Sequence, residues 1–229
     1  MPSRQRTEQT EQLPRGRHRL TREAVERSQR ERALRGMVEA VADRGYAETR
    51  VVDVIERAGV SRKTFYELFG DREDCFLAAY DEASARLYAV TADAFEQAAA
   101  ESWPERIRAG VTALVELLAS DQALARFAVI EVLAAGPRAL ARRDAAIRQF
   151  TGFIDAGRSE SSLELPGLTS TAIVGGIYEL LYTEILHGAT SQLTAQVPEL
   201  VYWITQPFLG PKRAAEERDR ARGAVAARA

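Results

Sequence analysis

Apolar residues recur every three or four positions through most of the chain, which is the spacing of helices with one buried face. The first stripe consists of Leu34, Met37, Val38 and Val41 and predicts a helix that stops at Gly45. Ser28 and Glu31 have the spacing of a capping box just before this stripe, and Thr21 is an alternative cap for an earlier start.

Three further helices follow at short intervals. The pattern predicts a short helix from Thr49 to about Ala58, a turn at Gly59, and a second short helix capped by Ser61. A longer helix capped by Asp71 follows this pair and is expected to extend toward residue 95.

The rest of the chain has the same pattern of helix start signals followed by apolar stripes, in longer helices. Start signals at Ser102, Asp121 and the Gly136–Pro137 pair each precede an apolar stripe. A loop rich in Ser, Gly and Pro is expected at 157–167, and helices are expected at 169–187 and 198–209. No stretch alternates in the manner of a strand, so the predicted fold class is all-α.

These elements divide the chain into four expected parts. They are a basic N-terminal arm (1–27), a three-helix head (28–75), a larger helical body (76–210) and a charged tail that frays after Gly210 (211–229).

Composition excludes several kinds of site. The chain has 229 residues, of which 46% are hydrophobic, with one cysteine and two histidines. An internal disulfide, a cysteine-based zinc cluster and a multi-histidine metal site are therefore not expected, and we predict no metal and no cofactor. No apolar run approaches the roughly 20 residues of a membrane span, and no secretory signal is visible, so we expect a cytoplasmic protein without a membrane partner.

Charge is divided unevenly along the chain. Residues 1–70 hold 15 Lys and Arg against 11 Asp and Glu, a net of +4, whereas residues 71–229 hold 16 against 22, a net of −6. A basic end on an acidic remainder indicates a surface that faces nucleic acid, although solvated helix faces produce similar asymmetry. Arg15, Arg17 and Arg19 lie in the arm, which is either a solvated leader or a segment that follows a DNA minor groove.

No catalytic signature is present. The sequence lacks a nucleophile elbow, a phosphate-binding glycine loop and a dinucleotide fingerprint. Cys75 lies on an apolar helix face, where a small core residue is the usual interpretation. The chain is therefore not expected to be an enzyme.

The stretch from Val51 to Leu68 has the pattern of a helix-turn-helix. Two short helices are joined at Gly59, where the chain must turn with positive φ, and Ser61 follows as the N-cap of the second helix. In such motifs the N-terminal end of the second helix enters the major groove. The inner positions are Val54, Ala58, Val60, Phe65 and Leu68, and the residues that project are Arg62, Lys63, Thr64, Tyr66 and Glu67. The alternative is an ordinary helical hairpin with exposed charges.

Residues 30–80 resemble the DNA-binding domain of the tetracycline-repressor (TetR) family of transcription regulators. The matching positions are Gly45, Tyr46, Thr49, Val51, Asp53, Val54, Ala58–Ser61, Thr64–Tyr66, Phe69 and Asp71–Glu73. The sequence departs from the family pattern at Arg50 and Lys63, where members often have Thr and Gly, and at Ile55, where a small Ala is usual.

The resemblance implies a homodimeric repressor that binds a double-stranded DNA operator and is released by a small-molecule effector whose identity is unknown. The implied DNA-binding residues are Arg17, Arg19, Arg50, Ser61, Arg62, Lys63, Thr64, Tyr66 and Arg72. The alternatives are a regulator without a ligand, controlled by abundance or a protein partner, and a helical enzyme or adaptor.

The body offers candidates for an effector pocket and for dimerisation. Residues that can line a pocket between helices are Tyr88, Phe95, Trp103, Phe127, Glu131, Phe150, Tyr178 and Tyr182. Aromatic residues at helical spacing are also typical of an ordinary core. In the family the last two helices pair with those of a second subunit; here they carry Ile173, Ile177, Leu180, Leu181, Leu200, Val201, Trp203, Ile204 and Phe208, with Gly175 and Gly176 allowing close approach.

Overall fold

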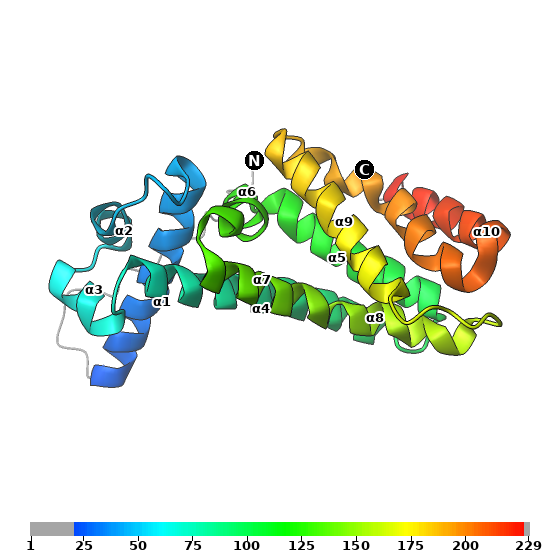
Figure 1. The fold of residues 1–229 in the computed structure, drawn as a ribbon, viewed down its shortest axis with the longest axis horizontal. Helices are drawn as coiled ribbons and strands as arrows, with labels where there is room; N and C mark the ends of the chain where they lie inside the picture. Colours follow the sequence, from blue (N-terminus) through cyan, green and yellow to red (C-terminus); the bar gives the residue numbers. More distant parts are fainter. Residues whose placement is uncertain (1–20, 227–229) are drawn as a thin grey trace, which may run out of the picture.

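The computed structural model describes residues 21–226, and this part of the chain is helical with no strand. Figure 1 shows the first three helices gathered at one end of an elongated molecule, with the remaining helices stacked beside them as a larger body. The predicted all-α class, with a three-helix head and a helical body, is confirmed.

Helix α1 (Arg22–Arg44) begins earlier than the capping-box pattern suggested. Thr21 is its N-cap and accepts a hydrogen bond from the Ala24 N–H at 3.2 Å, so Ser28 lies inside the helix. The polar turn before the apolar stripe is helical because Thr21 satisfies a free N–H at the helix start. The helix ends at Gly45 with φ +80°, as the sequence predicts.

Helices α2 (Val51–Ala58) and α3 (Arg62–Leu68) complete the head. Gly36 of α1 explains how closely α1 and α2 pack, because a Cβ atom at this position would lie 2.9 Å from the Val54 carbonyl oxygen. Helix α4 (Arg72–Gln97), capped by Asp71 as predicted, then runs from the head along the body (Figure 1).

Helix α5 (Trp103–Ser120) packs along α4 and begins with the predicted Ser102–Glu105 capping box. The stripe after Asp121 is not one α-helix. It comprises α6 (Gln122–Ala125), a π-helical turn η1 (Arg126–Ile130) and a 3-10 turn η2 (Glu131–Ala134). Such a π turn widens the helix locally and is frequent at functional sites.

Helix α7 (Pro137–Gln149) lies beside α4 and is followed by α8 (Thr151–Asp155) and the 3-10 turn η3 (Ala156–Glu160). The sequence predicted a single helix across this region, but α7 ends at Phe150, whose ring packs against Phe153 in the next turn.

Helix α9 (Thr169–Leu186), the 3-10 turn η4 (Thr190–Gln196) and α10 (Val197–Ala226) close the body. The expectation of a frayed tail after Gly210 is wrong. Gly210 (φ +78°) reverses the chain, and the second half of α10 folds back along the first, where Arg222 pairs with Glu199 at 2.7 Å (Figure 1). The sequence pattern did not predict this helix because most of its residues are charged. Its buried side is narrow and carries Ala214, Glu217 and Ala221.

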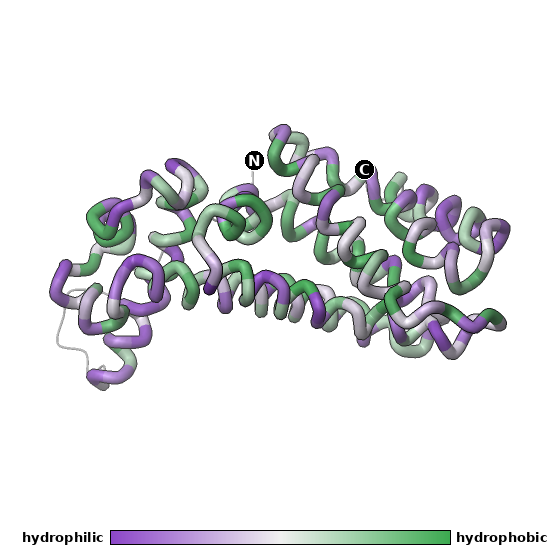
Figure 2. Tube along the Cα trace, in the orientation of Figure 1, coloured by the Kyte–Doolittle hydropathy of each residue, from purple (hydrophilic) through white to green (hydrophobic). Residues whose placement is uncertain are grey.

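Three hydrophobic clusters hold the molecule together. One joins the head to α4 and to the segment around Phe127, and the other two lie within the body. Figure 2 shows hydrophobic stretches recurring along the body helices, between hydrophilic ones. Within the described residues 21–226, no helix is both long and apolar enough to cross a membrane.

Candidate DNA-binding head and effector cavity

The helix-turn-helix is held by local bonds that the sequence signals anticipated. Gly59 adopts the left-handed conformation (φ +60°), and the Ser61 hydroxyl accepts a hydrogen bond from the Thr64 N–H at 3.0 Å. Arg32 of α1 adds a brace that the sequence analysis missed, because its guanidinium donates to the Ala58 and Gly59 carbonyls at 2.8 and 3.0 Å. The turn is therefore fixed before any DNA is present.

Helix α3 exposes a basic and aromatic face. The Lys63 side chain is 85% exposed, and its ammonium lies 3.7 Å from the Glu67 carboxylate. The Arg62 guanidinium lies over the Tyr66 ring, 5.8 Å from its centre, and Tyr66 is 47% exposed. These three side chains project from the first turns of α3, where a recognition helix meets base edges.

The hydroxyl groups of Ser61 and Thr64 form a hydrogen bond with each other in the absence of DNA. Their hydroxyl oxygens lie 2.9 Å apart across the N-terminus of α3. Because this terminus presents free N–H groups beside both hydroxyls, it can face a phosphate once the head docks on DNA.

Arg50 is 71% exposed at the start of α2, with its Nε atom 3.5 Å from the Asp53 carboxylate. Asp53 is buried and accepts a hydrogen bond from the Arg50 N–H at 2.8 Å, which holds the pKa of its carboxyl below the usual value. The Arg50 guanidinium can therefore extend to a phosphate while its backbone stays capped.

Arg72 was predicted to contact DNA, but its guanidinium is bonded within the protein. Its guanidinium donates to the Tyr46 and Thr49 carbonyls and lies 4.3 Å from the centre of the Tyr46 ring. These bonds fasten the start of α4 to the loop between α1 and α2. Arg17 and Arg19, the two predicted contacts in the arm, lie outside the described residues.

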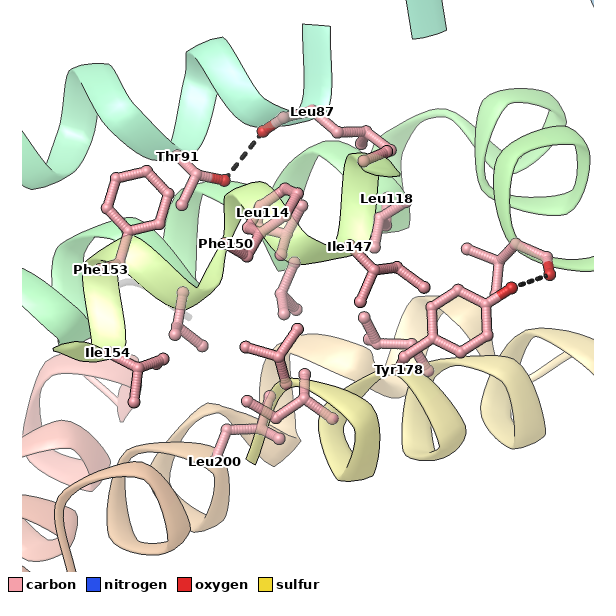
Figure 3. A pocket seen from close by; sticks show the side chains of 18 of the residues that line it. Leu87, Thr91, Leu114, Leu118, Ile147, Phe150, Phe153, Ile154, Tyr178 and Leu200 are labelled. Carbon is pink, nitrogen blue, oxygen red and sulfur yellow. Dashed lines mark hydrogen bonds between the residues drawn. The ribbon is translucent and has the colours of Figure 1, made fainter. Parts of the chain in front are cut away.

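The body contains an apolar cavity of about 130 Å³ between α4, α5, α7, α8, α9 and α10. Figure 3 shows its walls, which are mostly aliphatic, with Leu87, Leu114, Leu118 and Ile147 pointing inward from three helices. The few polar groups on the wall are largely bonded to the backbone. Thr91 donates to the Leu87 carbonyl at 2.8 Å and Tyr178 to the Val129 carbonyl at 2.7 Å.

Three of the predicted pocket residues line this cavity, namely Phe95, Phe150 and Tyr178. The other aromatic candidates do not. Trp103 packs on Phe208 and donates to the Phe153 carbonyl at 2.9 Å, as a core residue does. Tyr88 and Tyr182 are half-buried behind the lining, because helical spacing does not distinguish residues that face a cavity from those that face a neighbouring helix.

Phe127 and Glu131 are also absent from the cavity wall; Phe127 packs at the start of α4 and Glu131 contacts the head. The Phe127 ring lies 4.7 Å from that of Phe76, which in turn lies 4.8 Å from that of Tyr46. Glu131 is only 6% exposed and accepts a hydrogen bond from the Tyr46 N–H at 2.9 Å, while its other oxygen pairs with Arg126 at 2.9 Å. A lone acid in an apolar stretch was the sequence signal for Glu131, but the signal did not reveal its partner.

Chemistry outside the head and the cavity is sparse. Within residues 21–226, no three histidine, cysteine or carboxylate side chains gather in a way that could hold a metal ion. Burial raises the pKa of the Cys75 thiol to about 12, so this thiol is inert at neutral pH.

A helix-turn-helix with an exposed basic recognition helix defines a DNA-binding protein of the helix-turn-helix class. Residues 34–79 match the family described as bacterial regulatory proteins, tetR family. The matched segment lies within the head and includes both helices of the helix-turn-helix. No curated protein matches the chain in sequence.

Several solved structures share the fold. The fatty acid degradation regulator FadR from Bacillus halodurans is 20% identical, with a TM-score of 0.69 over 77% of this chain and 94% of that one. FadR from Bacillus subtilis, solved in complex with stearoyl-CoA, is 19% identical, with a TM-score of 0.66 over 79% and 98% of the two chains.

The tetR regulator TylP from Streptomyces fradiae is 18% identical, with a TM-score of 0.61 over 90% and 99% of the two chains. At these identities the similarity establishes that the head and the body share one fold with these regulators.

Proposed function

We propose that the protein is a transcriptional repressor that leaves its DNA operator when an acyl compound enters the body cavity. The observation that carries this proposal is the position of one segment, residues 126–134, hereafter the coupling segment. It contributes to the cavity wall and also contacts the DNA-binding head.

Within the coupling segment, residues that line the cavity alternate with residues that pack toward the head. Ala128 and Val129 line the cavity, and Val129 also accepts the hydrogen bond from Tyr178. Glu131 contacts the Tyr46 N–H in the head, and Phe127 packs on Phe76 of α4, whose ring lies against that of Tyr46. Because these contacts are tightly packed, a displacement of the cavity wall must be taken up at the head.

The cavity wall favours a hydrocarbon ligand. It is apolar on nearly every side, and burying hydrocarbon contributes roughly 0.8 kcal/mol per CH₂ group. The stearoyl-CoA bound to FadR of Bacillus subtilis supports an acyl compound as the ligand class.

The size of the cavity makes ligand binding a conformational signal. At about 130 Å³ the cavity is close to that of an engineered site of about 150 Å³ that holds one benzene ring. A long acyl chain must therefore widen it. The ligand then has higher affinity for the widened state, which is the condition for allosteric release.

We also propose a homodimer formed through α9 and the first half of α10. Trp203 is 63% exposed on α10, and Gly175 and Gly176 are exposed on α9 with open space above them. Five residues expected at the interface instead fill the subunit's own core, and these are Leu181, Leu200, Val201, Ile204 and Phe208. The interface therefore rests on the outer faces of the two helices.

The proposal is tested with an operator selected from a random-sequence DNA pool. Palmitic acid or palmitoyl-CoA should release this operator from the unmodified protein. Leu114→Trp, which fills the cavity, should bind the operator but resist release, at a cost in stability of about 1–3 kcal/mol. Leu163→Trp, at a 62% exposed loop position, is the matched control. Equal release of both variants would contradict the use of this cavity.

A further inference from the structure

The cavity wall changes character at its end nearest the DNA-binding head. Along α7 and α8, one stripe faces the cavity and consists of Ile147, Phe150 and Ile154. Arg143 occupies the preceding position of this stripe, four residues before Ile147, which is one helical turn. Arg143 is not itself part of the wall, but its guanidinium lies just beyond the end of this stripe, against the Tyr178 ring that lines the cavity.

Arg143 is buried more deeply than its charge warrants. Its side chain is 23% exposed, and its guanidinium lies 4.1 Å from the centre of the Tyr178 ring, which is itself part of the cavity wall. One of its nitrogens pairs with the exposed Asp144 at 2.8 Å. Its Nε atom is buried without a hydrogen-bond partner, and no other side-chain nitrogen or oxygen within residues 21–226 is recorded in that state.

An unpaired N–H of a buried guanidinium is costly, since a polar group taken from water needs a replacement partner. Tyr80 and Ser84 of α4 also line the cavity. Burial raises the pKa of the Tyr80 phenol, so it stays protonated, and its electrostatic neighbours include Tyr178 and Arg143. The Arg143 Nε–H is therefore a donor without a partner beside the Tyr178 side of the cavity, whereas the Tyr178 hydroxyl already donates to the Val129 carbonyl.

We propose that Arg143 determines ligand specificity by receiving the carboxylate of a long-chain fatty acid, with the acyl chain extending along α7 toward Phe153. This inference rests on the proposed function and adds the charge and orientation of the effector. A guanidinium binds a carboxylate through two parallel N–H donors, whereas an ester or thioester carbonyl carries no charge and accepts more weakly.

The orientation has a regulatory consequence. Tyr178, on which the Arg143 guanidinium lies, donates to the Val129 carbonyl in the coupling segment. A carboxylate bound to Arg143 would therefore be separated from the coupling segment only by the Tyr178 side chain.

The test compares palmitic acid, methyl palmitate and palmitoyl-CoA by calorimetric titration against the full-length protein. The unmodified protein should bind the acid about 10- to 100-fold more tightly than the methyl ester, the range expected for hydrogen bonds to a charged group. Arg143→Met keeps the side chain's apolar stem and should lose this preference while binding the methyl ester as before. Arg143→Lys keeps the positive charge but not the paired N–H donors of the guanidinium, so it should retain part of the preference for the acid.

Arg142→Met is the matched control, because Arg142 is the adjacent arginine and pairs with Asp81 on the surface. It should bind all three compounds as the unmodified protein does. Three outcomes would overturn the role of Arg143. They are an unchanged preference for the acid in Arg143→Met, equal binding of acid and methyl ester by the unmodified protein, and preference of the unmodified protein for palmitoyl-CoA. Each of these outcomes leaves an acyl effector in place, whereas failure of all three compounds to bind overturns the proposed function as well.

Discussion

The carboxylate of Glu131 in the body accepts a hydrogen bond from the backbone N–H of Tyr46 in the head at 2.9 Å. The two residues are 85 positions apart in the chain and both are buried. Gly45 lies beside this contact, and its φ of +80°, which L side chains rarely adopt, turns the chain so that the following Tyr46 N–H meets the carboxylate. The head is thereby joined to the body at a second place besides α4.

Glu131→Ala should separate DNA binding from its release. The substitution leaves the Tyr46 N–H without a partner, which should cost about 1–3 kcal/mol of stability in chemical denaturation. Operator affinity without effector should remain, and the loss of affinity on adding palmitic acid should shrink. Glu82→Ala, at an exposed position of α4, is the control. A variant that still releases DNA as fully as the unmodified protein would show that the bond carries no coupling.

The exposed side chains of α3 should contribute to DNA binding without stabilising the fold. Arg62→Ala should relax specificity at one operator position by about 1–3 kcal/mol if the guanidinium binds guanine. Lys63→Ala should weaken all operators similarly and lower the slope of log K against log salt by about 0.9. Anisotropy titrations on single-base operator variants distinguish the two. If Arg62→Ala ranks every variant as the unmodified protein does, the base contact is wrongly placed.

The N-terminal arm gives a prediction from sequence alone, since residues 1–20 lie outside the described part of the chain. Arg15, Arg17 and Arg19 are spaced to follow a narrow groove, and each phosphate that the arm neutralises adds about 0.9 to the salt slope. Deletion of residues 1–20 should weaken operator binding and reduce the slope by about one to three units. Unchanged affinity and slope would identify the arm as a solvated leader.

Trp203→Glu should convert a dimer into a monomer. A 63% exposed indole on α10 is expected to be covered by a partner, and a carboxylate there would then be buried at the interface. Light scattering at micromolar concentration reports the mass, and Leu163→Glu, at a loop position of similar exposure, should leave it unchanged. Operator half-sites should then lie about 34–36 Å apart or at a multiple of this spacing. A monomeric unmodified protein would remove this geometry.

The head was predictable from sequence because its signals are local. Gly59, Ser61 and Asp71 each act within one helical turn, so each position marks a turn or a cap regardless of the rest of the fold. Arg72 shows the limit of this reasoning. Its type and position agree with a DNA contact, and only the structure reveals the two carbonyls that it binds.

The cavity was less predictable because it is formed by helices far apart in the chain. Its lining is mainly aliphatic, and no spacing rule distinguishes Leu114 in a cavity wall from Leu117 packed against the head's core until the facing helices are placed. Arg143 could have been found from its place four residues before Ile147. The π turn after Ala125 had no signal at all, since its residue types are those of an ordinary buried helix.

The most direct test of the account is hydrogen exchange at the Tyr46 amide, followed by NMR with and without palmitic acid. The account predicts that this amide is protected in the free protein, because it donates to buried Glu131, and exchanges faster once the fatty acid fills the cavity and the operator is released. Protection that stays unchanged while the fatty acid binds and the operator dissociates would contradict coupling through this contact.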